Sequence, residues 1–257
     1  MIILSIEKNF YDKISNWDFS MINCEEECLT KWNLQKEIEK NSDSNSIILD
    51  LGTGGGEKVL HDFPKVKKIL GTDFSSNMIE TAKNNLKKSG KDYIEFKVMD
   101  NLNMDTPNDY FDIVVARHTV ISAKQIYKTL KKGGKLLLRG VDKLDCWQLK
   151  LLFEKGQAFN DPKPISLIDY ENIIKAGFKK VELIPIHIRE YYKTKEDLLA
   201  LLLKTPILTN FSEMGVSTID DDKVLDMNLL DKYINENTTD KGILLIRRYY
   251  GITATKE

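Results

Sequence analysis

Short apolar runs recur from residue 47 onward, and a stretch with helical periodicity separates each run from the next. Residues 47–50, Ile-Ile-Leu-Asp, form a run of the kind that becomes a strand buried on both faces. Residues 93–99 instead alternate apolar with charged side chains, which favours a strand near a sheet edge. Five other strands are expected at 68–73, 111–116, 136–138, 178–188 and 243–255.

Between these runs, apolar residues recur at intervals of three and four, as they do on the buried face of a helix. One such helix begins after Ser75 or Ser76, either of which can cap it, and its apolar face comprises Met78, Ile79, Ala82 and Leu86. Strands that alternate with helices pair in parallel through right-handed crossovers. The pattern therefore predicts an α/β fold with an open, doubly wound sheet.

The pattern changes after residue 139. Ser166 and Asp169 have the spacing of a capping box, and Gly177 is placed to end the helix that they would begin. Arg247 and Arg248 interrupt the final apolar run, and these polar interruptions favour an edge or antiparallel strand.

Two segments lie outside the alternating pattern and are expected to cover one end of the sheet. Residues 1–46 carry a broken apolar stripe, which predicts a helical segment. Residues 190–240 precede the last strand and include a second capping-box pattern, Thr194 with Asp197. We therefore divide the chain into a helical lid segment (1–46) and a core domain (47–257), in which 190–240 is a substrate-cap insertion.

Composition and charge narrow the class of protein. The 257 residues are 42% hydrophobic and 30% charged, as in an ordinary soluble domain. Lys and Arg number 38 against 39 Asp and Glu, so no overall positive field favours a nucleic acid. No stretch approaches the roughly 20 apolar residues that span a bilayer. We expect a cytoplasmic protein without a membrane or nucleic-acid partner.

The three cysteines are too few for a disulfide framework and indicate a reducing compartment. Cys24 and Cys28 are four residues apart and would face one side of the predicted helix, a spacing that suits a metal ion. Three glutamates stand between them, and the sequence has no matching second pair. We therefore expect no metal site.

The most specific signal is a glycine-rich loop, Asp50-Leu51-Gly52-Thr53-Gly54-Gly55-Gly56, between a predicted strand and a predicted helix. Glycines there allow a tight turn and the close approach of a ligand to the backbone. A Walker-type loop needs Lys and Ser or Thr after its last glycine, whereas Glu57-Lys58-Val59 follow here.

A dinucleotide site needs a third glycine where Glu57 stands, and a carboxylate at that helix terminus would repel a pyrophosphate. The acids Asp50 and Glu57 instead suit a ligand with positive charge and no phosphate. S-adenosylmethionine, with its sulfonium and ammonium groups, is such a ligand.

Residues 48–56, Ile-Leu-Asp-Leu-Gly-Thr-Gly-Gly-Gly, resemble the first motif of class I S-adenosylmethionine-dependent methyltransferases. Residues 111–116 are similar to the fourth strand of that family, and residues 130–135 to the turn before its fifth strand. The motifs together cover residues 47–139. The resemblance implies a Rossmann-like, seven-stranded, mostly parallel sheet with an antiparallel last strand, and the seven expected strands agree with it.

The resemblance also implies the cofactor site. Asp73, 23 residues after Asp50, corresponds to the acid that binds the ribose hydroxyls, and Asp100 to the acid that binds the adenine amino group. Asn101 and Leu102 would lie beside the adenine ring, and Tyr11 would close over the methionine end. The expected cofactor-binding set is Tyr11, Asp50, Gly52, Thr53, Gly54, Asp73, Phe74, Met78, Asp100, Asn101, Leu102 and Arg117.

His118 follows the predicted fourth strand, at the sheet edge that faces the ligand. A histidine there can contact the acceptor or take a proton from it, so His118 is the candidate catalytic residue. The sequence predicts a methyltransferase that acts on a small molecule or short peptide. The alternatives are an RNA methyltransferase, a non-catalytic S-adenosylmethionine-binding module and a dehydrogenase. The negative charge of Glu57 disfavours the dehydrogenase.

Overall fold

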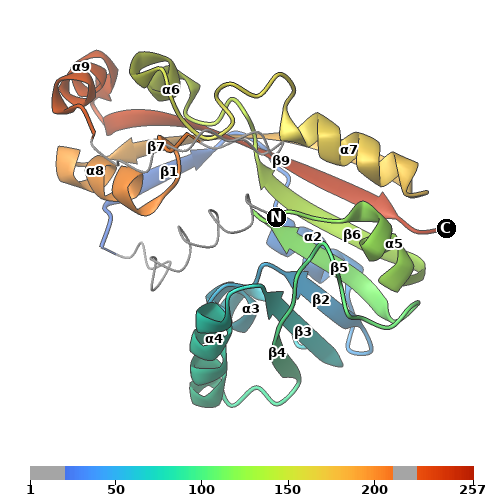
Figure 1. The fold of residues 1–257 in the computed structure, drawn as a ribbon. Coiled ribbons are helices and arrows are strands. Elements are labelled where there is room, and N and C mark those ends of the chain that lie inside the picture. The colour runs from blue at the N-terminus through green and yellow to red at the C-terminus, as the bar shows by residue number, and fades with distance from the viewer. Residues whose placement is uncertain (1–20, 211–224) are drawn as a thin grey trace.

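The computed structural model describes residues 21–210 and 225–257, which fold around one mixed sheet (Figure 1). Nine strands are described, eight of them in the order β1-β7-β9-β6-β5-β2-β3-β4, while the short β8 pairs with β9. The strands are β1 Cys24–Cys28, β2 Ile47–Leu51, β3 Lys68–Asp73, β4 Ile94–Val98, β5 Phe111–Arg117, β6 Leu130–Val141, β7 Lys179–Tyr192, β8 Thr238–Thr239 and β9 Gly242–Thr255. The described helices are α2 Leu34–Asn41, α3 Glu57–Asp62, α4 Ser76–Ser89, α5 Ala123–Thr129, α6 Trp147–Phe153, α7 Ile165–Lys175, α8 Lys195–Lys204 and α9 Met227–Asn237.

The strands from β4 to β6 form the parallel half of the sheet. All five residues of β2 are buried, as the continuous apolar run predicts. β4 forms an edge, and its alternation places Ile94 and Phe96 inside while Glu95 and Lys97 face solvent. The predicted doubly wound α/β fold is confirmed for this half.

Helices cover both faces of the parallel half. On one face, α2, α3 and α4 pack over one set of strand residues, including Ile48, Ile69 and Val115. On the other face, α5 and α7 pack over the alternate set, including Leu49 and Val114. The strand order reverses at β2, because the chain proceeds to β3 and β4 on one side and then to β5 and β6 on the other. In such sheets the ligand crevice lies outside the carboxyl ends of the strands at the reversal, here β2 and β5.

The rest of the sheet is antiparallel. β9 lies between β6 and β7 and is antiparallel to both, so the last strand has the predicted direction but is not an edge. Its pairing with β6 ends at Val141 and Tyr249, whereas its pairing with β7 continues to Tyr192 and Ile243. β7 and β9 therefore extend beyond the parallel half as a two-stranded arm, to which β1 adds an outer strand.

β1 replaces the helix that the apolar stripe of residues 1–46 predicts for Cys24–Cys28. Cys24 pairs with Tyr192 and Cys28 with Ile188, so the strand forms along the otherwise unpaired edge of β7. Four residues of extended chain separate the two cysteines by about 13 Å, compared with one turn in a helix. Among the described residues no group of His, Cys, Asp and Glu side chains could hold a metal ion.

Helices α6, α8 and α9 gather at the far end of the arm (Figure 1). Their apolar side chains form a separate cluster with the ends of β7 and β9, in which Leu198, Leu201 and Leu202 of α8 are buried. The predicted capping box of α8 is present, with Thr194 and Asp197 each bonded to the backbone of the other. The leucines of the 190–240 insertion thus pack within this cluster.

The capping box predicted for α7 is wrong. Pro164 precedes the helix and no side chain caps it. Ser166 instead donates to Asp142 Oδ2 at 3.1 Å, and Asp169 accepts from the Tyr250 hydroxyl at 2.6 Å. Both side chains serve long-range contacts that sequence spacing does not reveal. No helix among the described residues has the length and apolarity needed to cross a lipid bilayer.

Candidate cofactor and acceptor site

The glycine loop turns sharply out of β2. Gly52 has φ +72°, and a Cβ on it would lie 2.7 Å from the Thr119 Cβ. The amides of Gly52 and Thr53 donate to the Thr72 carbonyl at 2.8 and 2.9 Å, which fixes the loop against the end of β3. The loop therefore needs glycine for its backbone conformation and for the close approach of the segment that follows β5.

Asp73 ends β3 and holds the glycine loop. Its Oδ2 accepts a hydrogen bond from the Gly54 amide at 3.0 Å, and its Oδ1 accepts one from the Ser75 amide at 2.9 Å. The residue is only 9% exposed. The carboxylate predicted to bind ribose thus also ties the loop to the start of α4.

Asp50, the last acid before the glycines, is almost fully buried. Burial, together with the nearby Asp73, raises the pKa of this carboxyl to about 6, although the positive charge of Arg117 and a contact with Thr53 oppose the shift. Because burial makes the ionised form of Asp50 costly, a nearby positive charge stabilises that form. A cationic group bound beside Asp50 would therefore favour its ionised form.

Asp100 and Asn101 follow β4. The Asp100 carboxylate accepts from the Leu102 amide at 2.8 Å and from Asn103 Nδ2 at 2.7 Å. Asn101 Nδ2 donates to Thr119 Oγ1 at 3.0 Å, which links this loop to the one after β5. Asn101 Oδ1 is buried and has no hydrogen-bond partner among the residues that the structure describes. A buried acceptor of this kind is expected to have a partner, and an adenosine amino or hydroxyl group fits that need.

The remaining predicted cofactor residues border these loops or lie elsewhere. Phe74 is half-buried between β3 and α4, Met78 is buried in α4, and Leu102 is 36% exposed. Tyr11 lies outside the described residues. The structure therefore brings the predicted loop residues together at the carboxyl ends of β2 to β5, the edge that the resemblance implies.

His118 follows β5 in a left-handed backbone conformation, with φ +49°, and its amide donates to the Arg139 carbonyl at 2.9 Å. Its ring lies 5.5 Å from that of Tyr249, and its Nε2 is 3.3 Å from Arg139 Nη1. Because a guanidinium has no acceptor, Nε2 accepts this bond and the ring proton lies on Nδ1.

His118 is solvent-exposed, with the Tyr249 ring and the Arg139 guanidinium beside its imidazole. Its pKa lies well below the usual value, first because of burial and then because of the charges of Arg139, Arg117 and Arg247. The imidazole is therefore neutral near pH 7.

Two residues beside His118 were missed at the sequence level. Arg139 follows the apolar run 136–138 in β6 as Arg117 follows the run 111–116 in β5, and the two are register partners, so the rule that selected Arg117 also applies to Arg139. The Arg139 guanidinium lies over the Tyr249 ring, with its central carbon 4.2 Å from the ring centroid. Tyr249 belongs to β9, and no sequence signal connects it to a position 110 residues earlier.

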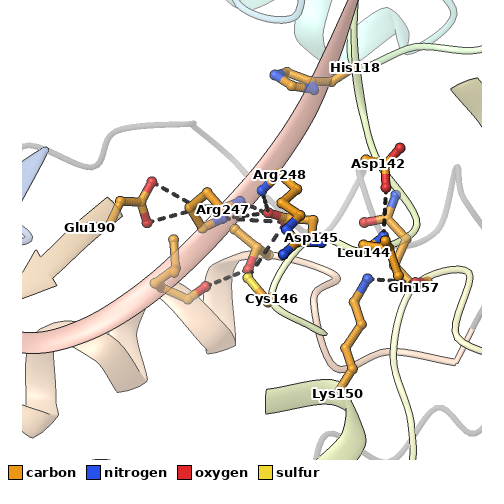
Figure 2. Close-up of polar contacts among 12 residues, drawn as sticks. His118, Asp142, Leu144, Asp145, Cys146, Lys150, Gln157, Glu190, Arg247 and Arg248 are labelled. Atoms are coloured by element: carbon orange, nitrogen blue, oxygen red, sulfur yellow. Dashed lines mark hydrogen bonds and ion pairs between the residues drawn. The ribbon is translucent and has the colours of Figure 1, made fainter. Parts of the chain in front are cut away.

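Arg247 lies over the Tyr249 ring, with its central carbon 5.0 Å from the ring centroid, and belongs to a buried ion cluster of the arm. Arg247 pairs with Asp145 at 3.0 Å and with Glu190 at 3.1 Å, and all three side chains are at most 8% exposed (Figure 2). Tyr192 adds a 2.5 Å hydrogen bond to Glu190. The interruption at Arg247 thus marks a buried ion cluster, and these pairs permit an arginine in a central strand.

Comparison with known proteins assigns the fold and the loop to a family. The family described as a methyltransferase domain matches residues 42–197, more than half of the chain. A demethylmenaquinone methyltransferase from Leptospira interrogans is 31% identical over 145 residues, which are 52% of this chain and 57% of the relative.

An uncharacterized methyltransferase from Bacillus subtilis, YcgJ, is 26% identical over 98 residues, 35% of this chain and 39% of the relative. The chain thus matches about two fifths of the length of one curated relative and about three fifths of the length of the other.

Solved structures show the same fold. The YcgJ structure aligns with a TM-score of 0.51 at 18% identity, covering 87% of this chain and 97% of that one. A phosphoethanolamine N-methyltransferase from Haemonchus contortus, solved with S-adenosylhomocysteine, aligns with a TM-score of 0.50 at 21% identity, covering 88% of this chain and 52% of that one. With its glycine loop and Asp73 inside the matched region, the chain belongs to the methyltransferase-domain family of class I, whose cofactor is S-adenosylmethionine.

Proposed function

We propose that this protein transfers the methyl group of S-adenosylmethionine to a small-molecule acceptor. The observation that carries the proposal is the assembly of Asp50, the glycine loop and Asp73 at the strand-order reversal, within the family match. This is where an open α/β sheet binds its ligand.

Each of the proposed site residues binds a different part of the cofactor. Asp73 binds the ribose hydroxyls while it keeps the loop in place, and Asp100 binds the adenine amino group. The buried Oδ1 of Asn101 provides a further acceptor. The ionised Asp50 stabilises the positive end. Phe74, Met78 and Leu102 supply the apolar contacts around the adenosine.

When bound, S-adenosylmethionine supplies a methyl group activated by its sulfonium. The chain has to align the acceptor and to exclude water, because methyl transfer needs few dedicated catalytic groups. We assign both tasks to the crevice beside His118, with the 190–240 insertion as a cap and the 1–46 segment as a lid, apart from β1 and α2, which pack in the sheet and on its face. We also propose a cytoplasmic location.

The contacts of His118 favour a role in orientation. A base whose pKa lies far below the working pH is weak, and Nε2 of this ring already accepts from Arg139. His118 is therefore proposed to contact the acceptor through Nδ1–H and to hold Arg139 in place. A general base at His118 would require that bond to break.

A small-molecule acceptor is favoured over RNA. The net charge of −1 gives no general attraction for a phosphate backbone. The relative from Leptospira interrogans is named for demethylmenaquinone, which is a small molecule. RNA methylation and a non-catalytic binding module are the alternatives that the experiment must separate.

The test combines binding with turnover. Calorimetry should show that S-adenosylmethionine and S-adenosylhomocysteine bind and that NAD does not. Incubation of the protein with isotopically labelled S-adenosylmethionine and a metabolite extract should then give a labelled small molecule by mass spectrometry. RNA is added in a parallel incubation, and label found only there would favour RNA methylation. Binding without any labelled product would indicate a binding module.

A further inference from the structure

Arginine is rare in this chain, and its placement is uneven. The sequence contains five arginines against 33 lysines. Three of the five, Arg117, Arg139 and Arg247, are close enough to His118 to lower its pKa. Because arginine binds carboxylates and phosphates through a planar fork that lysine lacks, this concentration suggests a binding role for the arginine side of the crevice.

Arg139 and Arg247 contact the same tyrosine but differ in their pairing. Their guanidinium carbons lie 4.2 and 5.0 Å from the centroid of the Tyr249 ring. Arg247 is neutralised by two buried carboxylates. Arg139, by contrast, forms no ion pair within residues 21–210 and 225–257. Arg247 is thus satisfied by the fold, whereas Arg139 keeps its capacity to bind an anion.

Two further arginines, Arg117 and Arg247, lie near Arg139. Burial and the charges of Arg117 and Arg247 lower its pKa, and Tyr249 and Glu26 only partly oppose them. Arg117 also forms no ion pair in the described ranges, and its backbone lies beside that of Arg139 on the next parallel strand. Arg117 and Arg139, neither of them in an ion pair within the described ranges, are stabilised when an anionic ligand lies between or above them.

The geometry also fixes the direction of the guanidinium. The Tyr249 ring supports one face of Arg139 and His118 Nε2 accepts from one of its five N–H groups. The His118 amide is bonded to the Arg139 carbonyl at 2.9 Å, so backbone and side chain of the two residues move together. A guanidinium oriented in this way loses little freedom when it binds a second planar or tetrahedral anion.

We propose that the methyl acceptor carries an anionic group, a carboxylate or a phosphate, and that Arg139, stacked on Tyr249 and oriented by His118, binds it. The proposal rests on the proposed function, because it assigns the acceptor end of the same crevice. The methionine end of the cofactor, with its ammonium toward Asp50, is assigned to the β2 side, two strands away from Arg139.

The experiment uses two probes, inorganic phosphate and acetate, each titrated at constant ionic strength into protein saturated with S-adenosylhomocysteine. Saturation fills the cofactor carboxylate site before the probe is added. Calorimetry should show saturable binding of one probe or both, and the tighter probe identifies the chemistry of the anion. In Arg139→Gln the affinity should fall roughly 10- to 100-fold, the range for a hydrogen bond with a charged group.

Arg189→Gln is the matched control, because Arg189 lies on β7 in an exposed ion pair with Glu27 at 3.5 Å. It should leave probe binding unchanged. If Arg139→Gln does not fold, Arg139→Lys provides the comparison, since it keeps the charge but loses the fork. NMR of the His118 ring gives a readout in the unaltered protein, because an anion on Arg139 should raise the His118 pKa while the signals of His61 and His187 stay in place.

Three results would overturn the proposal while leaving the proposed function intact. These are the absence of saturable binding at millimolar probe concentrations, equal binding in Arg139→Gln, and probe binding that disappears when S-adenosylhomocysteine is present. The last result would assign the arginines to the cofactor carboxylate. Failure of the protein to bind S-adenosylhomocysteine at all would instead count against the proposed function.

Discussion

The two sides of the crevice carry opposite charges. Carboxylates stand on the side formed by β2, β3 and β4, namely Asp50, Asp73 and Asp100. Arginines stand on the other side, where Arg117 ends β5 and pairs in register with Arg139 of β6. The change of sign coincides with the reversal of strand order between β2 and β5. The same sheet edge thus offers a place for a cationic cofactor and, one or two strands away, a place for an anion.

The two halves of the sheet are also stabilised differently. Helices cover the parallel half on both faces with continuous apolar clusters. The antiparallel arm combines a smaller apolar cluster with the buried pairs of Arg247, Asp145 and Glu190. Mutations can therefore separate what holds the arm from what binds the cofactor.

The largest effect is expected from Arg247→Met. This change leaves Asp145 and Glu190 buried without a counter-charge, and breaking such a cluster typically costs about 3–5 kcal/mol. Urea denaturation should show this loss in the free energy of unfolding. Arg189→Gln removes an exposed pair and should change it by less than about 1 kcal/mol. A loss for Arg247→Met as small as that of the control would show that the arm does not depend on the cluster.

The contrast between the halves also explains what the sequence could predict. The strands and helices of the parallel half can be predicted from local patterns, because each apolar run or stripe shows which of its own residues are buried. The glycine loop, Asp73 and Asp100 could likewise be predicted, because each stands at or just after the end of a predicted strand. Their specific contacts, such as Asp73 with Gly54, needed the structure.

The arm depends on pairing between distant residues. β1 contains Cys-Glu-Glu-Glu-Cys, which has no strand alternation, and forms because the edge of β7 is available. Arg247 interrupts an apolar run, and only the structure shows that Asp145, 102 residues away in the sequence, neutralises it. Tyr249 and Arg139 meet for the same reason. A single sequence contains no signal for such pairs.

The second prediction concerns the acidic side. Asp73→Ala should weaken the binding of S-adenosylhomocysteine by about 1.5–3 kcal/mol, the scale of hydrogen bonds with a charged partner. The loss combines the ribose contact with the freed Gly54 and Ser75 amides. Calorimetry measures it, with Asp105→Ala, an exposed acid paired with Lys97, as the control. Unchanged affinity in a folded Asp73→Ala protein would place the ribose elsewhere.

A third prediction follows from the raised pKa of Asp50, from 3.8 to about 6. The folded, unliganded protein keeps a proton on Asp50 at pH 5 that the unfolded chain has lost, so burial of this acid costs stability as pH rises from about 4 to 6. A bound cation favours the carboxylate. The affinity for S-adenosylmethionine should therefore rise with pH and level off above pH 6.

At pH 5 the affinity should be about tenfold below its plateau, since one unit below the pKa about nine tenths of the acid is protonated. Asp50→Asn should lower the plateau and remove the pH dependence, whereas Asp105→Asn should keep both. A pH profile that is the same in Asp50→Asn and the unaltered protein would assign the titration to another group.

The smallest effect comes from a matched pair of helix caps, one in each half. The Ser75 hydroxyl accepts from the Met78 amide at the start of α4, and the Thr194 hydroxyl accepts from the Asp197 amide at the start of α8. Either cap changed to Ala should cost about 1 kcal/mol of unfolding free energy.

The two caps should differ in their effect on the cofactor. Ser75 donates its amide to Asp73, so a looser start of α4 disturbs the ribose acid, and Ser75→Ala should also weaken S-adenosylhomocysteine binding. Thr194 belongs to the arm, which carries none of the proposed cofactor-binding residues, so Thr194→Ala should leave that affinity unchanged. Urea denaturation and calorimetry on the same preparations give both quantities. If Thr194→Ala weakened cofactor binding as much as Ser75→Ala, the arm and the cofactor side would be energetically coupled, and the division between the two halves would have to be abandoned.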